Sequence, residues 1–183
     1  MTTTDNTLTF RVATPADAEL VQPLVQSAYR GESSRQGWTT EADLLSGTRI
    51  DVKGIIEKIT TPGSAVLLAF NSQSELVACC EVLKRDSHLS YFGMFAVDPK
   101  RQAGGLGRQV LGHAEEYART VHGVHKMEMS VIWTRNELID WYVRRGYRKT
   151  EVERPFPHKE LASIGGAALR DDLHFVVLEK DLV

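Results

Sequence analysis

The spacing of hydrophobic residues along the chain switches repeatedly between the period of a β-strand and that of an α-helix. Alternating or continuous apolar runs predict strands, and apolar residues three or four positions apart predict helices with one buried face. Strands are expected at residues 7–12, 65–70, 76–83, 90–97, 127–132, 148–153 and 174–179. Helices are expected at 14–28, about 41–45, 52–60, 105–121 and 137–145.

Residue types that favour helix starts and turns support this division. Thr14, Pro15 and Asp17 suit the first turn of a helix through capping, a fixed φ angle and the helix dipole. The turn-forming residues 71–74 join two expected strands into an antiparallel hairpin. Strand–helix–strand units follow, so the sequence predicts a mixed α/β fold. The 183 residues fit one domain with a core at about 7–180.

Composition and charge argue against several classes of protein. A net charge of −2 provides no large basic surface for nucleic acid, and no apolar run reaches the roughly 20 residues of a membrane span. No signal peptide is expected at the N-terminus. Cys79 and Cys80 are adjacent, so they are expected to be buried free thiols of a cytoplasmic protein. The six histidines lack metal-ligand spacing, and no metal site is expected.

The strongest chemical signal is a glycine-rich turn between the strand that ends at Val97 and the helix expected from residue 105. Helix starts leave backbone N–H groups unpaired and carry a partial positive charge. The three glycines leave room for a phosphate, and three basic side chains surround them: Lys100, Arg101 and Arg108. The turn therefore predicts a site for a pyrophosphate.

Two common phosphate motifs do not fit this turn. The P-loop requires Gly-Lys-Ser/Thr, whereas Gly107 precedes Arg108 and Gln109. The dinucleotide motif requires a third glycine where Val110 stands, and no acidic residue follows at the expected strand end. Neither a nucleoside triphosphate nor a dinucleotide is therefore favoured as the ligand.

Two segments resemble the motifs of one family. Gln102-Ala103-Gly104-Gly105-Leu106-Gly107 follows Val97-Asp98-Pro99, and a second segment runs from Asn136 through Tyr142 and Gly146 to Tyr147. They resemble the Gln/Arg-x-x-Gly-x-Gly/Ala signature and the Asn…Tyr-x-x-x-Gly-Phe/Tyr segment of the GNAT superfamily of N-acetyltransferases, with a spacing from Asn to Tyr one residue shorter than usual. The resemblance implies a mixed, mostly antiparallel central sheet with helices on both faces and strands splayed at the coenzyme A site.

The resemblance also implies how acetyl-coenzyme A, the co-substrate of this family, would be held. Backbone groups of Phe95, Ala96 and Val97 would pair with the pantetheine arm like an added strand, and an N–H near Phe95 would polarise the thioester carbonyl. The pyrophosphate would rest on the glycine turn. The remaining implied coenzyme A-binding residues are Gln102, Ala103, Gly104, Gly105, Leu106, Gly107, Arg108, Asn136 and Tyr142.

Proton transfer requires an acid and a base. Tyr142 falls where the family carries a tyrosine that protonates the departing thiolate, and a phenol is protonated at neutral pH. For the base, Glu81 lies in an apolar strand, where a carboxylate is expected to have a raised pKa. Glu128 on another strand and a chain of water molecules remain alternatives, as does a purely solvent-facing role for Glu81.

The acceptor is expected between residues 29–40 and 155–173, the latter long enough to form a lid. Glu32, Arg35 and Trp38 in the first segment, with Glu81, are the candidate substrate-binding residues. The predicted function is transfer of an acetyl group to the primary amine of a small molecule. The alternatives are a protein lysine or N-terminal acetyltransferase, and a non-catalytic acyl-coenzyme A sensor. The strand at 174–179 is expected at a sheet edge, where a homodimer could form.

Overall fold

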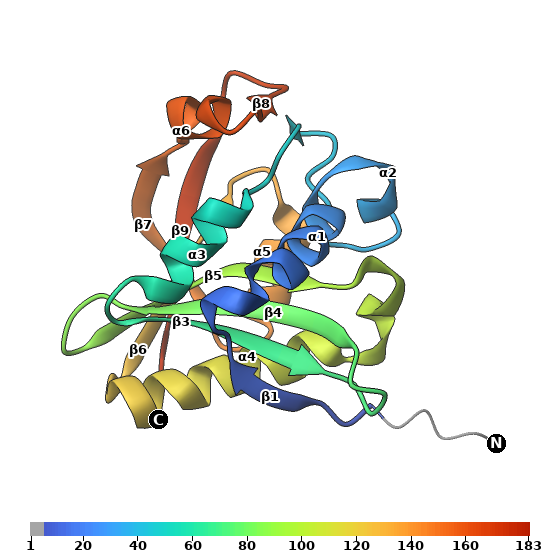
Figure 1. Ribbon diagram of the computed structural model, residues 1–183. Coiled ribbons are helices and arrows are strands. Elements are labelled where there is room, and N and C mark those ends of the chain that lie inside the picture. The colour runs from blue at the N-terminus through green and yellow to red at the C-terminus, as the bar shows by residue number, and fades with distance from the viewer. Residues whose placement is uncertain (1–5) are drawn as a thin grey trace.

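The computed structural model describes residues 6–183 and contains a seven-stranded sheet in the order β1-β3-β4-β5-β6-β9-β7 (Figure 1). The strands of this sheet are β1 (Thr9–Val12), β3 (Ser64–Phe70), β4 (Leu76–Lys84), β5 (Leu89–Val97), β6 (Lys126–Ile132), β7 (Arg148–Pro155) and β9 (His174–Asp181). The short strands β2 (Leu45–Ser46) and β8 (Ala167–Ala168) form a second, two-stranded sheet. The helices are α1 (Ala18–Tyr29), α2 (Gly31–Ser34), α3 (Val52–Thr60), α4 (Leu106–Tyr117), α5 (Asn136–Val143) and α6 (His158–Ser163).

Helices cover both faces of the large sheet, as predicted. Figure 1 shows α1 and α3 on one side and α4 on the other. The apolar residues of α1 and α3 pack with Val66, Leu68 and Cys79, while those of α4 and α5 pack with Leu67 and Cys80. Successive residues of a strand point to opposite faces, so the two free, buried cysteines lie in different cores.

The strands are mostly antiparallel, and β5 and β6 form the parallel pair of the sheet. Their pairing runs from Leu89 and Lys126 to Tyr91 and Glu128 and then ends. Beyond that point β6 stays paired with β9 as far as Ile132, whereas β5 stays with β4. The two central strands therefore separate over their second halves, which confirms the predicted splay.

An irregularity in β5 lies directly beside the splay. The register of β4 and β5 shifts between the pairs Glu81–Gly93 and Cys79–Ala96, so β5 holds one extra residue. Met94 in this bulge has a φ of 46°, a left-handed conformation that L-residues with side chains seldom adopt. The bulge changes which face the following residues occupy.

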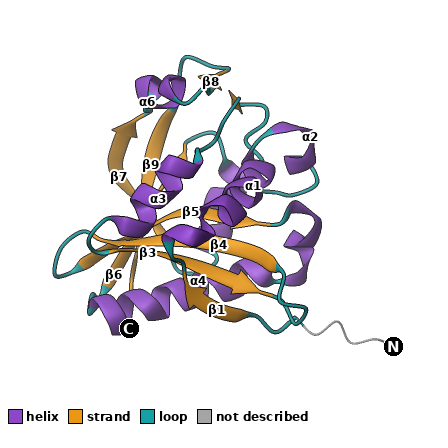
Figure 2. Ribbon diagram, viewed as in Figure 1, coloured by secondary structure: helices purple, strands orange, loops and turns teal. Residues whose placement is uncertain are grey.

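Two expectations from the sequence are wrong. Residues 41–44 form a turn that leads into β2, because β2 pairs with the distant β8 and so cannot extend a helix. The strand that ends the chain is not an edge, because β9 lies between β6 and β7. Its consecutive buried residues Val176, Val177 and Leu178 are typical of a strand covered on both faces. The segment of α6 and β8 lies at the ends of β7 and β9 (Figure 2). None of the helices in residues 6–183 is long and apolar enough to cross a bilayer.

Candidate active site

The glycine turn connects β5 to α4 through a short 3₁₀ helix, Pro99–Gly104. Asp98 begins this helix, and its carboxylate accepts a hydrogen bond of 3.0 Å from the Lys100 N–H. Gly105 then adopts a φ of 74°, with open space where a side chain would stand. The first N–H groups of α4 have no acceptor within the helix, so the turn presents unpaired donors at the positive end of the helix dipole.

The other two glycines of the turn contact protein side chains. A β-carbon at Gly104 would lie 2.9 Å from Nδ2 of Asn6, and one at Gly107 would lie 3.3 Å from the ring of Phe95 and 3.5 Å from that of Trp141. Leu106 and Gly107 are buried. Only Gly105 among the three therefore leaves the kind of open space that the sequence reasoning assigned to all of them.

Gln102 is buried and its side chain joins the turn to the segment after α1. Its Nε2 donates to the Val97 carbonyl at 3.0 Å and to the Thr39 hydroxyl at 2.8 Å. Its Oε1 accepts from the Trp38 N–H at 2.7 Å. Gln102 was predicted to contact coenzyme A through its backbone, and the structure adds a positioning role for its side chain. Ala103 lies in the same 3₁₀ helix.

The basic residues around the turn divide into two groups. Arg101 is paired with Glu75, in the loop between β3 and β4, at 2.9 Å. Arg108 instead lines a hollow of about 560 Å³ between α4 and α5. The other charged residues of this hollow are Glu115, Arg144, Arg145 and Lys180.

Cations outnumber anions in this hollow. Glu115 is paired with Lys180 at 3.0 Å, whereas Arg108, Arg144 and Arg145 have no carboxylate partner within residues 6–183. Burial and the nearby charges of Arg144 and Arg108 lower the pKa of Arg145. Such crowding of guanidinium groups favours an anion of the size of a phosphate.

The bulged end of β5 is held by a residue from α1. The hydroxyl of the buried Tyr29 donates a hydrogen bond to the carbonyl of Phe95. Phe95, Ala96 and Val97 follow the bulge and are all buried. They lie on the strand that borders the splay, which is where the sequence reasoning placed the pantetheine contacts.

Tyr142 lies on α5 with its ring among other aromatic side chains. Its ring centroid is 5.1 Å from that of Trp141, 5.8 Å from Tyr147 and 6.5 Å from Phe92 of β5. Burial, followed by the nearby phenol of Tyr29, raises its pKa well above the usual value. The phenol is therefore protonated at every physiological pH and can act as a proton donor.

Asn136, the other residue expected on this helix to contact coenzyme A, is exposed at its start. The preceding residue, Arg135, has the more specific contacts. It donates to the Thr39 carbonyl at 2.7 Å and is paired with Glu41 at 3.0 Å. The start of α5 is thus tied to the same segment that Gln102 holds.

The candidate base Glu81 is buried but not in purely apolar surroundings. Its carboxylate is 2.6 Å from Nζ of Lys58 on α3 and accepts a hydrogen bond of 3.2 Å from Ser64. Its Oε2 lies 3.5 Å from the place that a β-carbon would take at Gly93, next to the bulge. Glu81 therefore lies beside the bulge of β5, and its ion pair with Lys58 restricts the movement of its carboxylate.

Glu128, the alternative base, is also paired. Its Oε1 is 2.9 Å from Nη2 of Arg154 on β7. It lies at the last pair of β5 and β6 before the splay, opposite Tyr91. Each buried carboxylate near the splay thus has a cationic partner.

The residues predicted to bind the acceptor do not gather at one place. Glu32 and Arg35 are exposed and contact each other at 3.0 Å, and neither lines the hollow at Arg108. Trp38 is half-buried, with its ring centroid 5.0 Å from that of Trp141 over the start of α4. Of this group, Trp38 approaches the predicted donor site and the two charged residues do not.

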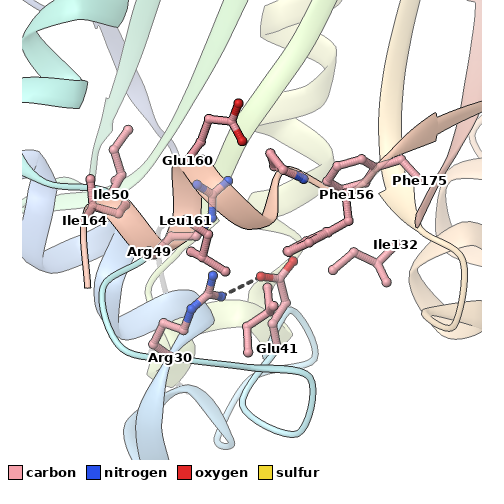
Figure 3. A pocket seen from close by; sticks show the side chains of 12 residues that line it. Arg30, Glu41, Arg49, Ile50, Ile132, Phe156, Glu160, Leu161, Ile164 and Phe175 are labelled. Carbon is pink, nitrogen blue, oxygen red and sulfur yellow. Dashed lines mark hydrogen bonds and ion pairs between the residues drawn. The ribbon is translucent and has the colours of Figure 1, made fainter. Parts of the chain in front are cut away.

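A second hollow, of about 270 Å³, is lined by Arg30, the residue after Tyr29, and by Arg49, whose guanidinium lies over the Tyr29 ring (Figure 3). It is called the hollow beyond Tyr29. Its walls come from the segment between α1 and β2, β2 itself, the β2–α3 segment, β6, β9 and the segment that contains α6. Figure 3 shows the Arg30–Glu41 pair on one side and the rings of Phe156 and Phe175 on another. The residues that line it are Arg30, Glu41, Leu45, Arg49, Ile50, Ile132, Phe156, Pro157, Glu160, Leu161, Ile164 and Phe175.

The sequence reasoning identified the two segments that flank this hollow and missed most of the residues that matter in it. Tyr29 and Arg30 were inside the expected segment without an assigned role. Glu41, Arg49 and Arg135 were not considered, because charged residues at single positions have no spacing that distinguishes a buried ion pair from a solvated one. The position of Arg135 directly before the second motif was the available signal.

Comparison with known proteins places these features in a family. A model of the acetyltransferase (GNAT) family matches residues 30–147. A comparison with curated protein sequences finds no match. The fold is similar to that of the spermidine/spermine N-acetyltransferase SpeG from Vibrio cholerae, with a TM-score of 0.66 at 13% identity over 98% of this chain and 95% of that one.

Two further solved structures share the fold. A protein described as an acyl-CoA N-acyltransferase from Klebsiella pneumoniae gives a TM-score of 0.63 at 18% identity, over 97% of this chain and 99% of that one. A GNAT-family acetyltransferase from Staphylococcus aureus gives 0.65 at 13% identity, over 97% and 100%. The splayed strands, the glycine turn at a helix start and the match over residues 30–147 lead to one conclusion: this chain belongs to the acetyltransferase (GNAT) family.

Proposed function

We propose that this chain is an N-acetyltransferase that moves an acetyl group from acetyl-coenzyme A to the primary amine of a small molecule, on one domain spanning about residues 7–180. The observation that carries the proposal is the course of β5. One strand runs along the open side of the splay, from the bulge at Met94 to Val97, and leads through Gly105 into the unpaired N–H groups of α4. The open edge of β5, which could pair with an amide-bearing arm, therefore leads directly into the proposed anion site at the start of α4.

The residues present fit coenzyme A. Backbone N–H groups at the start of α4 suit the pyrophosphate, and the hollow with Arg108, Arg144 and Arg145 suits a further phosphate. The backbone of Phe95 to Val97 can pair with the pantetheine amides, because β6 does not cover it beyond Tyr91. When bound, acetyl-coenzyme A supplies an acyl group activated as a thioester.

The protein's own groups would then orient the reactants and handle protons. Tyr29 fixes the carbonyl of Phe95 and so sets the direction of the neighbouring N–H groups. Tyr142 holds a proton at its phenol oxygen, available to the departing sulfur. Glu81, the buried carboxylate next to the bulge, is the proposed acceptor of the proton that leaves the amine, directly or through water.

The hollow beyond Tyr29 supports a small acceptor. It is bordered by α6 and the residues before it, and its walls are mostly apolar. A shape of this kind suits a small molecule better than a long peptide. Spermidine/spermine, the acceptors named for the Vibrio cholerae neighbour, are small amines too.

Two measurements test the proposal. Titration calorimetry with acetyl-coenzyme A and with dephospho-coenzyme A checks the donor, and weaker binding of the dephospho form is expected because the basic hollow loses its anion. A thiol-release assay over small amines and lysine-containing peptides then checks the reaction. Absence of acetyl-coenzyme A binding at high micromolar concentrations would refute the donor assignment. Thiol release with peptides alone would favour a protein acetyltransferase, and donor binding without turnover would favour a sensor.

A further inference from the structure

More positive than negative charge is gathered around the hollow beyond Tyr29. Arg30 and Arg135 both contact Glu41, at nitrogen–oxygen distances of 2.6 and 3.0 Å. Arg49 lines the same hollow and acts on Glu41 by its charge, whereas Arg135 contacts Glu41 from outside the lining, so three guanidinium groups surround one buried carboxylate. Glu160 lies at the rim and is exposed, where water screens its charge. The Glu41 charge is therefore shared and leaves a positive surplus around the hollow.

Two of these guanidinium groups have donors without a partner. The side chain of Arg30 is only 3% exposed, and its buried Nε makes no hydrogen bond. The guanidinium of Arg49 lies over the ring of Tyr29, 5.1 Å from its centroid, and has no ion pair or hydrogen bond within residues 6–183. The Nε of Arg30 is a buried donor without a partner, which is costly and uncommon. The guanidinium of Arg49 is half-exposed at the hollow and has no carboxylate partner among residues 6–183. Together they indicate a site for a negatively charged acceptor of hydrogen bonds.

The charges are close enough to act on one another. Burial lowers the pKa of Arg30, Glu41 opposes this effect, and the positive charge of Arg49 adds to it. Arg49 also contributes to the lowered pKa of Glu41. An anion placed between Arg30 and Arg49 would relieve the repulsion between them.

The location of Arg49 relative to β5 limits the distance between the anionic group of an acceptor, bound at Arg49, and its amino group, which would have to reach β5. One face of the Tyr29 ring contacts Arg49, and the hydroxyl of the same ring donates to the Phe95 carbonyl. An anion at Arg49 is therefore separated from the bulged strand by about the length of one phenol side chain. A ligand whose amino group and anionic group are only a few bonds apart can span this distance.

The remaining walls are apolar. Ile132 and Phe175 come from the paired ends of β6 and β9, and Phe156 and Leu161 come from the segment with α6. Together with Leu45 they form a buried cluster of their own beside the charged residues. These walls suit a hydrocarbon or aromatic side chain.

We propose that the acceptor is a small amine that carries a carboxylate near its amino group and an apolar side chain, as an α-amino acid such as leucine or phenylalanine does. The carboxylate binds Arg49 and Arg30, and the side chain lies against Phe156 and Phe175. The inference rests on the proposed function and narrows its substrate. The positive charges of a polycation such as spermidine would be repelled by the surplus of guanidinium groups, so this class of acceptor is disfavoured.

Matched ligands test this directly. Thiol release from acetyl-coenzyme A is measured with leucine, phenylalanine and methionine, with their amides, with the corresponding decarboxylated amines, and with spermidine. Since hydrogen bonds to charged groups are worth about 1.5–3 kcal/mol each, kcat/KM should be roughly tenfold to a hundredfold higher for each acid than for its amide. Equal rates for acid and amide, or a preference for spermidine, would overturn the proposal.

Variants then connect the preference to Arg49. Arg49→Met keeps an unbranched side chain, shorter than that of arginine, and removes its charge, so KM for leucine should rise at least about tenfold and the preference for leucine over the decarboxylated amine, measured as the ratio of their kcat/KM values, should fall by a similar factor. Arg119→Met is the matched control, because Arg119 is exposed near the end of α4 and paired with Glu116. A similar loss for both ligands in Arg49→Met would indicate a structural effect and contradict the assignment.

A binding experiment separates failure of this inference from failure of the proposed function. With coenzyme A present, calorimetry is used to titrate N-acetylleucine and the neutral N-isoamylacetamide. Tighter binding of the acid, lost in Arg49→Met, supports the carboxylate site without requiring turnover. If acetyl-coenzyme A binds and amines react regardless of a carboxylate, this inference is wrong and the function stands. If acetyl-coenzyme A does not bind, the function itself is wrong.

Discussion

The charged residues beside the proposed acceptor hollow can be tested by measuring how much Glu41 contributes to the stability of the fold. Glu41 is 8% exposed, and its side chain contacts those of Arg30 and Arg135, which are 3% and 10% exposed. Glu41→Gln keeps the shape and removes the charge, so two buried guanidinium groups lose their counter-ion. Removing one partner of a buried ion pair costs about 3–5 kcal/mol. For a chain of this size that corresponds to a fall in Tm of roughly 6–20 °C.

The assay is equilibrium unfolding in urea at pH 7, with calorimetric melting as a second readout. Glu116→Gln is the control, because Glu116 makes an exposed pair with Arg119, and such pairs contribute at most about 1 kcal/mol. Exposed ion pairs contribute at most ~1 kcal/mol. If both methods place the stability of Glu41→Gln within that margin of the wild type, the view that Glu41 neutralises buried cations is refuted.

The effect should also depend on pH. Burial alone would raise the pKa of Glu41, but Arg135, Arg49 and Arg30 outweigh it and hold the pKa below its usual value. A carboxylate whose pKa is lower in the folded state stabilises the fold fully above the unfolded-state pKa of about 4.3. That contribution is lost as the pH falls through the lower, folded-state pKa. The difference between the wild type and Glu41→Gln should therefore be largest near neutral pH and shrink in acid.

Four further substitutions, one of them a control, have defined outcomes. Tyr142→Phe should lower kcat about a hundredfold or more without weakening acetyl-coenzyme A binding, since it removes the proton donor; unchanged steady-state turnover would eliminate that role. Gly105→Ala should lower the free energy of unfolding in urea by about 1–2 kcal/mol because Gly105 has a left-handed φ. Gly112→Ala is the control: Gly112 also has open space around it but lies within α4, so alanine there should raise the free energy of unfolding by about 0.5–1 kcal/mol. Gln102→Ala should lower the free energy of unfolding by about 2–3 kcal/mol and raise KM for both substrates, because it releases the segment at Trp38 from the glycine turn. An unchanged KM for the acceptor would contradict the view that Gln102 links the two sites.

The fold was largely predictable because its main signals are local. The period of the hydrophobic pattern located α3 and the β3–β4 hairpin almost to the residue, and Gly105 marked the start of α4. The errors occurred where a distant partner decides the structure. Leu45 forms a strand because Ala168 lies beside it, and β9 is internal because β6 and β7 pair with its two sides.

The candidate site divides in the same way. The candidate donor side could be proposed from the sequence because its residues lie in one continuous segment, Val97 to Gly107, where backbone conformation and residue type are linked. The acceptor side combines Arg30, Glu41, Arg49 and Arg135 from separate parts of the chain. Nothing in the local sequence distinguishes these charges from the exposed Glu32 and Arg35, because burial is a property of the tertiary structure.

The position of β9 has a consequence for how the protein is made. The strands β1, β3, β4 and β5 pair with one another in chain order, and they and α4 all precede β6 in the sequence. The edge strand β7 pairs only with β9, which leaves the ribosome after it. The strands β1, β3, β4 and β5, with the glycine turn and α4, can therefore assemble while synthesis continues. Ile132 and Phe175, which pair beside the proposed acceptor hollow, meet only once the last strand has emerged. A nascent chain would form its proposed phosphate site before it formed the walls proposed to select the substrate.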